Sequence, residues 1–260
     1  MVENATVNNL SLFYVAIAFI IQFIVPIALA IYLYRKKKIT KKPFIVGLIS
    51  FIITHIVVEI VLIHALQSTS WYQNFARSSV FLASFFFVSV VGFLEEIARV
   101  KGFILFLKKQ WDWKDGIAFG LGFGGMESIF AGLSSANKIL ATLAINYKAF
   151  SKFKVAVPVQ KMLITTAPSI FLAAGLESLF VLSIQIGLTL LALYGIRNDK
   201  HRYSIYAVII HILINLPLSS LNKLIGVWGT EALLALIALI AVVLSYKAKE
   251  WYSSSINVFR

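Results

Sequence analysis

Seven long apolar runs constrain this chain more than any other feature of its sequence. They lie at residues 11–34, 44–66, 79–107, 116–133, 168–196, 203–222 and 228–246. A helix needs about 20 apolar residues to cross the hydrocarbon of a bilayer. Only 13% of the residues are charged and 60% are hydrophobic, whereas soluble domains are about one-quarter charged. The sequence therefore predicts an all-α, polytopic membrane protein with about seven transmembrane helices, forming a single integral membrane domain over residues 1–260.

The basic residues between these runs predict the orientation and account for the net charge of +13. With the N-terminus outside, the inward connections carry fifteen Lys and Arg residues and the outward connections seven, five of which lie in one long segment. Long segments weigh less in the positive-inside rule, so we expect an N-out, C-in topology. Membrane lipid is then the expected partner. Nucleic acid is not, since no zinc-finger spacing or basic aromatic recognition motif is present.

That long segment, residues 134–167, separates the fourth and fifth runs. Its apolar residues recur near helical spacing with lysines between them, which predicts an amphipathic insertion on the extracytoplasmic side, lying in the headgroup plane. The alternative is a lid or gate that admits a membrane-delivered substrate.

Two adjacent carboxylates and an arginine interrupt the third apolar run. Charged groups inside a bilayer are costly, so they are usually paired and functional. Arg99 follows Glu95 by four residues and Glu96 by three, so this one arginine can reach either carboxylate on a helical face.

Other polar side chains reach the same depth when residues are counted from the run ends at 1.5 Å each. They are Glu127 in the fourth run, Glu177 in the fifth, His211 in the sixth, and His55 with Glu59 in the second. One arginine does not neutralise all these carboxylates, so either some are protonated or a metal ion lies among them. Protonated acids that form interhelical hydrogen bonds are the structural alternative. We expect the acids and His211 to meet in one pocket.

His211 and Asn215 are four residues apart and share a helical face, so one helix can supply two metal ligands. A histidine hydrogen-bonded to a neighbouring helix is the alternative. Gln185, eight residues after Glu177, faces roughly the same way as Glu177 and can bind a water or a carbonyl, but an amide is a poor ligand for zinc.

Four motifs in order along the chain resemble the YhfC family of intramembrane metalloproteases. They are Glu95-Glu96-x-x-Arg99, Gly122-x-Gly124-Gly125-x-Glu127, Gly175-x-Glu177 and His211-x-x-x-Asn215. This family belongs to a wider group with the PrsW proteases and the type II CAAX-processing endopeptidases, called the CPBP or Abi proteins. The resemblance covers roughly residues 10 to 245. It implies a CPBP-like helical core, a multi-pass location in a bacterial plasma membrane, and hydrolysis of a membrane-embedded or membrane-delivered peptide.

The resemblance also implies roles for single residues. Glu95 or Glu96 would activate a water, Arg99 would hold the pair, and His211 with Asn215 would help to hold a metal or the oxyanion. Zinc or another divalent cation is the implied cofactor. Glu127 and His55 are further candidate ligands, and Glu127, Glu177, Gln185 and Asn215 are expected to line the pocket.

The chain departs from the family pattern at one point. A second histidine is expected from a middle span, and the candidate positions hold Phe123 and Gln185. This leaves open a metallo- or glutamate-type endopeptidase, with zinc, with a harder cation or without a metal. It also leaves open an inactive relative that acts as a receptor, scaffold or immunity-type protein, and a small proton- or cation-coupled transporter.

Overall fold

The computed structural model describes residues 6–147, 154–215 and 218–254, with backbone only at 58–60, 218–219 and 254. Every regular element within these ranges is helical. The first half of the chain holds α1 (Asn9–Phe19), α2 (Val25–Arg35), α3 (Lys41–His55), α4 (Ile63–Gln67), α5 (Ser70–Ser78) and α6 (Val80–Lys101). The second half holds α7 (Trp113–Asn146), α8 (Val157–Thr165), α9 (Pro168–Arg197), α10 (Arg202–Ile214) and α11 (Leu218–Ser254). Three π-helical turns, Ile20–Ile24, Ile56–Leu62 and Gly102–Phe106, extend or join these helices.

Five helical segments of the described chain are long and apolar enough to cross a membrane. They are Asn9–Arg35, Val80–Phe106, Trp113–Asn146, Pro168–Arg197 and Ser220–Ser253. The prediction of an all-α, multi-pass membrane protein is thus confirmed. The count of seven spans and the N-out orientation stay predictions.

Helix α7 is longer than the run from which it was predicted. It begins at a capping box between Asp112 and Asp115 and continues without a break to Asn146, well past residue 133. Residues 134–146 contain neither a proline nor a glycine and are rich in good helix formers, so nothing ends the helix at residue 133. The first part of the expected insertion therefore continues a spanning helix. Its place in the headgroup plane is still a prediction, and residues 148–153 lie outside the described chain.

The predicted boundary between the spans at 203–222 and 228–246 is wrong. Helix α10 ends at Ile214, and Asn215 caps it. Pro217 follows in the sequence, and a helix usually ends before the residue that precedes a proline. With 13 residues, α10 is about 20 Å long, shorter than the hydrocarbon is thick. Helix α11 then runs to Ser254, with a break at Gly226, where φ is 75° and ψ is 164°.

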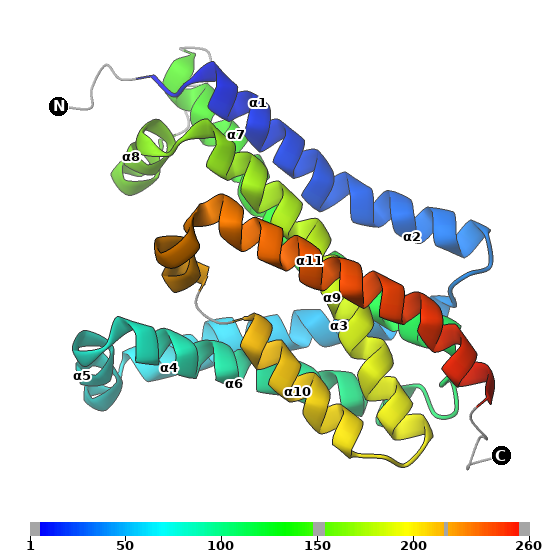
Figure 1. Ribbon diagram of the computed structural model, residues 1–260. Helices are drawn as coiled ribbons and strands as arrows, with labels where there is room; N and C mark the ends of the chain where they lie inside the picture. The colour runs from blue at the N-terminus through cyan, green and yellow to red at the C-terminus, as the bar shows by residue number, and fades with distance from the viewer. Residues whose placement is uncertain (1–5, 148–153, 216–217, 255–260) are drawn as a thin grey trace.

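Helices α7 and α9 form the centre of the molecule. Helix α7 packs against α3, α9 and α1, and α9 packs against α11, α1 and α10 (Figure 1). Glycines allow this close packing, because a Cβ added to Gly122 would collide with the backbone oxygen of Phe44 on α3. The polar residues of α6, α7, α9 and α10 are thereby brought together between the helices.

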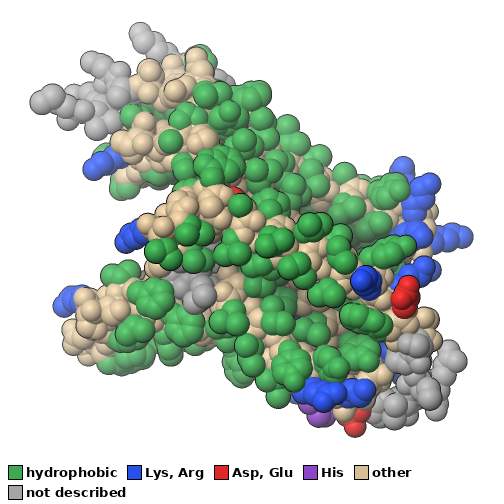
Figure 2. Space-filling view, in the orientation of Figure 1, with side chains coloured by type: hydrophobic (Ala, Val, Ile, Leu, Met, Phe, Trp, Pro, Cys, Tyr) green, Lys and Arg blue, Asp and Glu red, His purple; other side chains and the backbone are tan. Residues whose placement is uncertain are grey.

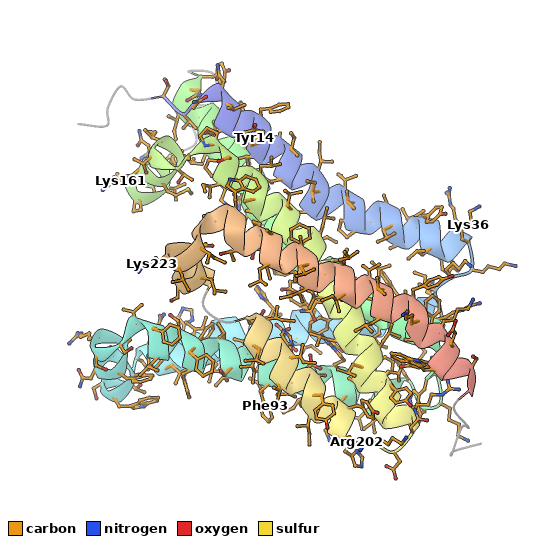
Figure 3. All side chains as sticks on the ribbon, viewed as in Figure 1. Tyr14, Lys36, Phe93, Lys161, Arg202 and Lys223 are labelled. Carbon is orange, nitrogen blue, oxygen red and sulfur yellow. The ribbon has the colours of Figure 1, made fainter. Side chains whose placement is uncertain are left out.

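The surface agrees with a membrane location. Figure 2 shows a broad hydrophobic belt, with Lys and Arg gathered towards the ends of the helices. One end carries Lys36 and Arg202, and the opposite end carries Lys161 and Lys223, as labelled in Figure 3.

Candidate functional site

The site is built on α6, where the side chains of the adjacent glutamates Glu95 and Glu96 point in different directions. Glu96 shares a helical face with Arg99 one turn later, and its Oε1 lies 2.9 Å from Arg99 Nη1. The side chains of Glu96 and Arg99 are 1% and 0% exposed, so this is a fully buried ion pair. The Arg99 guanidinium also lies over the ring of Phe123, 5.0 Å from its centroid. Arg99 therefore fixes Glu96 inside the protein.

His211 on α10 contacts both glutamates. Its Nδ1 lies 2.8 Å from Glu96 Oε1, and its Nε2 lies 3.4 Å from Glu95 Oε2. Gly92, one turn before Glu96, faces the imidazole, and a Cβ added there would lie 3.7 Å from His211 Cγ, an ordinary contact. Both ring nitrogens are thus directed at carboxylates.

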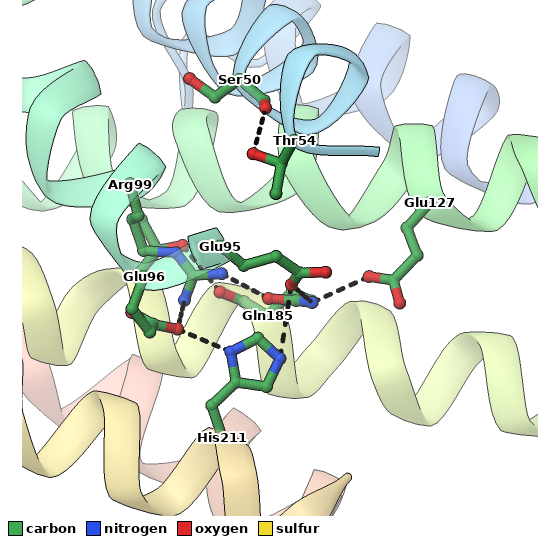
Figure 4. Close-up of polar contacts among 9 residues, drawn as sticks. Ser50, Thr54, Glu95, Glu96, Arg99, Glu127, Gln185 and His211 are labelled. Atoms are coloured by element: carbon green, nitrogen blue, oxygen red, sulfur yellow. Dashed lines mark hydrogen bonds and ion pairs between the residues drawn. The ribbon is translucent and has the colours of Figure 1, made fainter. Parts of the chain in front are cut away.

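Gln185 on α9 joins this group to α7 (Figure 4). Its Nε2 donates to Glu127 Oε2 at 2.8 Å and to Glu95 Oε2 at 3.4 Å. Its Oε1 accepts a hydrogen bond from Arg99 Nη2. A Cβ added at Gly124 would lie 2.8 Å from Gln185 Cβ, so this glycine lets α7 approach the amide. The amide therefore links Glu95, Glu127 and Arg99.

A cavity of about 440 Å³ opens beside this network. Its polar lining consists of Thr54, His55, Glu95, Glu127 and Asn215, and its apolar lining of Phe51, Val91, Phe130 and Ala131. Glu96 and Arg99 lie behind this lining. Of the two adjacent glutamates, only Glu95 faces the space in which a substrate would fit.

The structure brings most of the predicted residues together, from five helices. Glu95, Glu96, Arg99, Glu127, Gln185 and His211 form one network, and Asn215 and His55 line the adjoining cavity. The His55 ring packs against Phe51 and Phe130, with centroid distances of 5.5 and 4.6 Å. The side chain of Glu59 lies outside the described part of the chain.

Glu177 lies apart from this network. It is eight residues, or about 12 Å along α9, from Gln185, and it is not among the described residues that line the cavity. Glu231 on α11 is a further buried carboxylate, which sequence reasoning did not single out. Glu231 comes only three residues after Trp228 in the sequence, at the start of the last apolar run, where a charged residue suits the membrane interface.

Sequence reasoning also missed the role of Phe123. At that position the family pattern suggests a histidine, but here the ring packs under the Arg99 guanidinium. Phe123 lies one residue before Gly124 in the glycine motif, and this position was the sequence signal that could have pointed to its role.

The helical fold and this buried charged network together define a multi-pass membrane protein with a polar site inside its transmembrane core. Residues 21–244 match the family described as YhfC intramembrane metalloprotease, so the chain belongs to that family. The membrane protein YhfC of Bacillus subtilis (strain 168) is similar to it, with 29% identity over 254 residues that cover 94% of this chain and 98% of the relative. No solved structure matches this chain significantly.

The family description implies a divalent metal, and the arrangement of the ligands can be compared with that expectation. A catalytic zinc takes three protein ligands and keeps one position open. Within the described ranges, no group of three His, Cys, Asp or Glu side chains is arranged to hold a metal ion. The Gln185 amide lies between the carboxylates of Glu95 and Glu127, and both nitrogens of His211 face glutamates. The residues as placed do not fit a three-ligand metal site.

Proposed function

We propose that this protein hydrolyses a peptide bond of a membrane-embedded or membrane-delivered peptide, in the cavity beside Glu95. The observation that carries the proposal is the convergence of Glu95, Glu127 and Asn215 on one cavity between the helices. Carboxylates are costly at this depth, and two of them facing one cavity are more than helix packing requires.

Glu95 is the general base in this proposal. It takes a proton from a water molecule, whose oxygen then bonds to the peptide carbonyl carbon. The same carboxyl next delivers that proton to the leaving nitrogen as the C–N bond breaks, so atoms and charge balance. Glu127 shares the Gln185 amide with Glu95 and orients the attacking water from the other side.

Glu96 has a different role although it is the next residue. It is engaged by Arg99 at 2.9 Å and by His211 at 2.8 Å, and it is buried behind the cavity lining. Its function is to position His211, whose Nε2 in turn lies 3.4 Å from the Glu95 carboxylate. Glu96 and Arg99 are therefore positioning residues, and Glu95 is the residue that reacts.

Asn215 supplies a hydrogen-bond donor for the oxyanion. It lines the cavity directly after the last turn of α10, and its backbone N–H donates to the His211 carbonyl at 3.0 Å, as the helix requires at its end. A fixed amide donor that is aimed at developing charge is a common source of transition-state stabilisation. No step is assigned to a metal, because the residues as placed do not present three ligands.

The test uses the purified protein in lipid nanodiscs with a panel of single-helix transmembrane peptides in water enriched in ¹⁸O. Hydrolysis is expected to produce new C-termini that carry the heavy oxygen, detected by mass spectrometry. The variant Glu95→Gln should lower the rate by about 10² to 10⁴-fold, the usual contribution of general acid–base catalysis. The matched control Glu250→Gln alters an exposed glutamate at the end of α11 and should retain the rate. Equal rates for Glu95→Gln and the unmodified protein would refute the assignment.

A second candidate function is partner binding in the same cavity without hydrolysis. The absence of a three-ligand metal arrangement among the described residues favours it. In that case no peptide in the panel acquires ¹⁸O, and a peptide remains bound to both the unmodified protein and Glu95→Gln.

A further inference from the structure

A groove separate from the charged site runs along the lipid-facing side of the molecule. Helix α9 forms its floor and helices α10 and α11 its walls, and it encloses about 460 Å³. Its lining is almost entirely apolar, and includes Ile184, Ile210, Ile237, Ala241 and Leu244. Figure 1 shows α11 and α10 on the near side with α9 behind them, and Figure 2 shows that this face is largely hydrophobic. In a membrane, the groove therefore opens towards the acyl chains.

One end of the groove differs from the rest. Tyr203, Trp251 and Tyr252 line it there, and aromatic residues of this kind prefer the interface between hydrocarbon and headgroups. Ser245 lies at the same end. This residue is 8% exposed, and its Oγ has no hydrogen-bond partner within the described chain. A buried hydroxyl without a partner is costly, so this atom points to a ligand that brings an acceptor.

Basic side chains flank this end on both walls. On α11, exposed Lys249 follows Ser245 by four residues and exposed Lys247 precedes Trp251 by four, so each lies beside the lining stripe. On α10, the guanidinium of Arg202 lies 5.3 Å from the ring centroid of Tyr203. Arg202 is labelled at this end of the molecule in Figure 3.

The acidic residues nearby do not cancel this charge. Asp112 is paired with buried Arg197 at 2.7 Å, and Asp199 lies 3.3 Å from His201. Glu250 is exposed on the same helix three residues after Lys247, so it lies beside that lysine and offsets one positive charge, which leaves Lys249 and Arg202. The groove end therefore combines net positive charge with interfacial aromatic rings.

We propose that this groove is a binding site for one anionic phospholipid. An acyl chain lies along the apolar lining, an ester carbonyl accepts a hydrogen bond from Ser245 Oγ, and the phosphate is held between Arg202 and the two lysines. Basic pockets between transmembrane helices are known to bind anionic headgroups. The site does not depend on the proposed hydrolysis.

The dimensions of α11 agree with this placement. From Ser245 to Lys249 the helix rises about 6 Å, and from Ile237 to Ser245 about 12 Å. One leaflet of hydrocarbon is about 15 Å deep, half of the ~30 Å core. The apolar part of the groove thus spans most of one leaflet, with Ser245 near the ester level and Lys249 near the phosphate level.

The test is native mass spectrometry of the detergent-purified full chain, titrated with phosphatidylglycerol and with phosphatidylcholine of identical acyl chains. We expect one phosphatidylglycerol molecule to be retained per chain, with at least about tenfold preference over phosphatidylcholine, given the contribution of each basic residue near anionic lipid. The variant Arg202→Gln/Lys247→Gln/Lys249→Gln should remove that preference. Ser245→Ala should weaken retention of both lipids several-fold, because it removes the hydrogen bond to the ester group that they share.

A matched control removes the same charge at the same end of the molecule, away from the groove. The variant Arg35→Gln/Lys36→Gln/Lys38→Gln alters three exposed residues that follow the first span, and it should retain the preference. Equal binding of the two lipids, or equal loss in the control and the groove variant, would overturn the proposal. A dimer that excludes lipid from the groove would overturn it as well, because the groove would then be an interface between two copies.

Discussion

The buried pair of Arg99 and Glu96 gives the sharpest energetic prediction. Replacing Arg99 with glutamine leaves the Glu96 carboxylate, which is 1% exposed, without its arginine. Removing one partner of a buried ion pair typically costs about 3 to 5 kcal/mol, because an uncompensated charge stays buried. His211 remains 2.8 Å from Glu96 and supplies part of the compensation. We therefore expect the lower end, a loss of about 3 kcal/mol in the free energy of unfolding, or roughly a hundredfold in the folded-to-unfolded ratio.

The measurement is reversible unfolding in bicelles, followed by steric trapping, over a double-mutant cycle of Arg99→Gln, Glu96→Gln and the double variant. The double variant should cost clearly less than the sum of the single variants, with a coupling energy of about 1 to 3 kcal/mol, because neither charge is left alone. Lys101→Gln is the matched control, since it removes an exposed positive charge from the same helix and should have little effect. Additive single variants, or a loss below about 1 kcal/mol for Arg99→Gln, would refute the buried-pair argument.

Three further outcomes test the site and the packing around it. Replacing Asn215 with alanine should lower kcat for peptide hydrolysis by about 10² to 10³-fold with little change in KM, the effect of losing one oxyanion donor, and an unchanged kcat would contradict its role. Dialysis against a chelator should leave hydrolysis nearly unchanged, and a loss restored by added zinc would show that the carboxylates do not act alone. The variant Gly122→Ala should destabilise the protein by about 1 to 3 kcal/mol, because the new Cβ collides with the Phe44 carbonyl on α3. In Gly125→Ala the Cβ would lie 3.6 Å from Pro26 Cβ, an ordinary contact, so that variant should retain its stability in thermal unfolding.

The sequence was a good guide to the class of fold. Apolar run length is a direct consequence of bilayer thickness, so the long helices α1 to α2, α6, α9 and α11 were expected from composition alone. Helix ends were less predictable. Residues 134–146 form a run of mixed polarity. The same pattern is typical of an interfacial helix and of the end of a long membrane span. Only packing against neighbouring helices decides between these two structures.

Depth along a helix does not determine which way a side chain points. Glu177 and Gln185 were both expected in the pocket, but only Gln185 reaches the network, because Glu177 lies about 12 Å away along α9 and the rotation of α9 about its axis directs Gln185 towards α6 and α7. That rotation depends on which faces of α7 and α11 touch α9, and hence on the glycine contacts between helices. Glu231 was overlooked for the same reason, since counting from the run end assigns it to the interface although α11 buries it.

The adjacent glutamates illustrate how the fold gives two neighbouring carboxylates different surroundings. Neighbouring residues on a helix point about 100° apart, so α6 must turn one carboxylate inward if it turns the other towards the cavity. Arg99 determines which carboxylate points inward. It lies one turn beyond Glu96 and pairs with that residue, so Glu95 faces the cavity. The sequence spacing alone allowed either pairing, and the geometry of the buried guanidinium, held by Phe123 and Gln185, selects one. Arg99 therefore pairs with the inner carboxylate, Glu96, and does not pair with the outer one, Glu95. The water activation that we propose for Glu95 requires this arrangement.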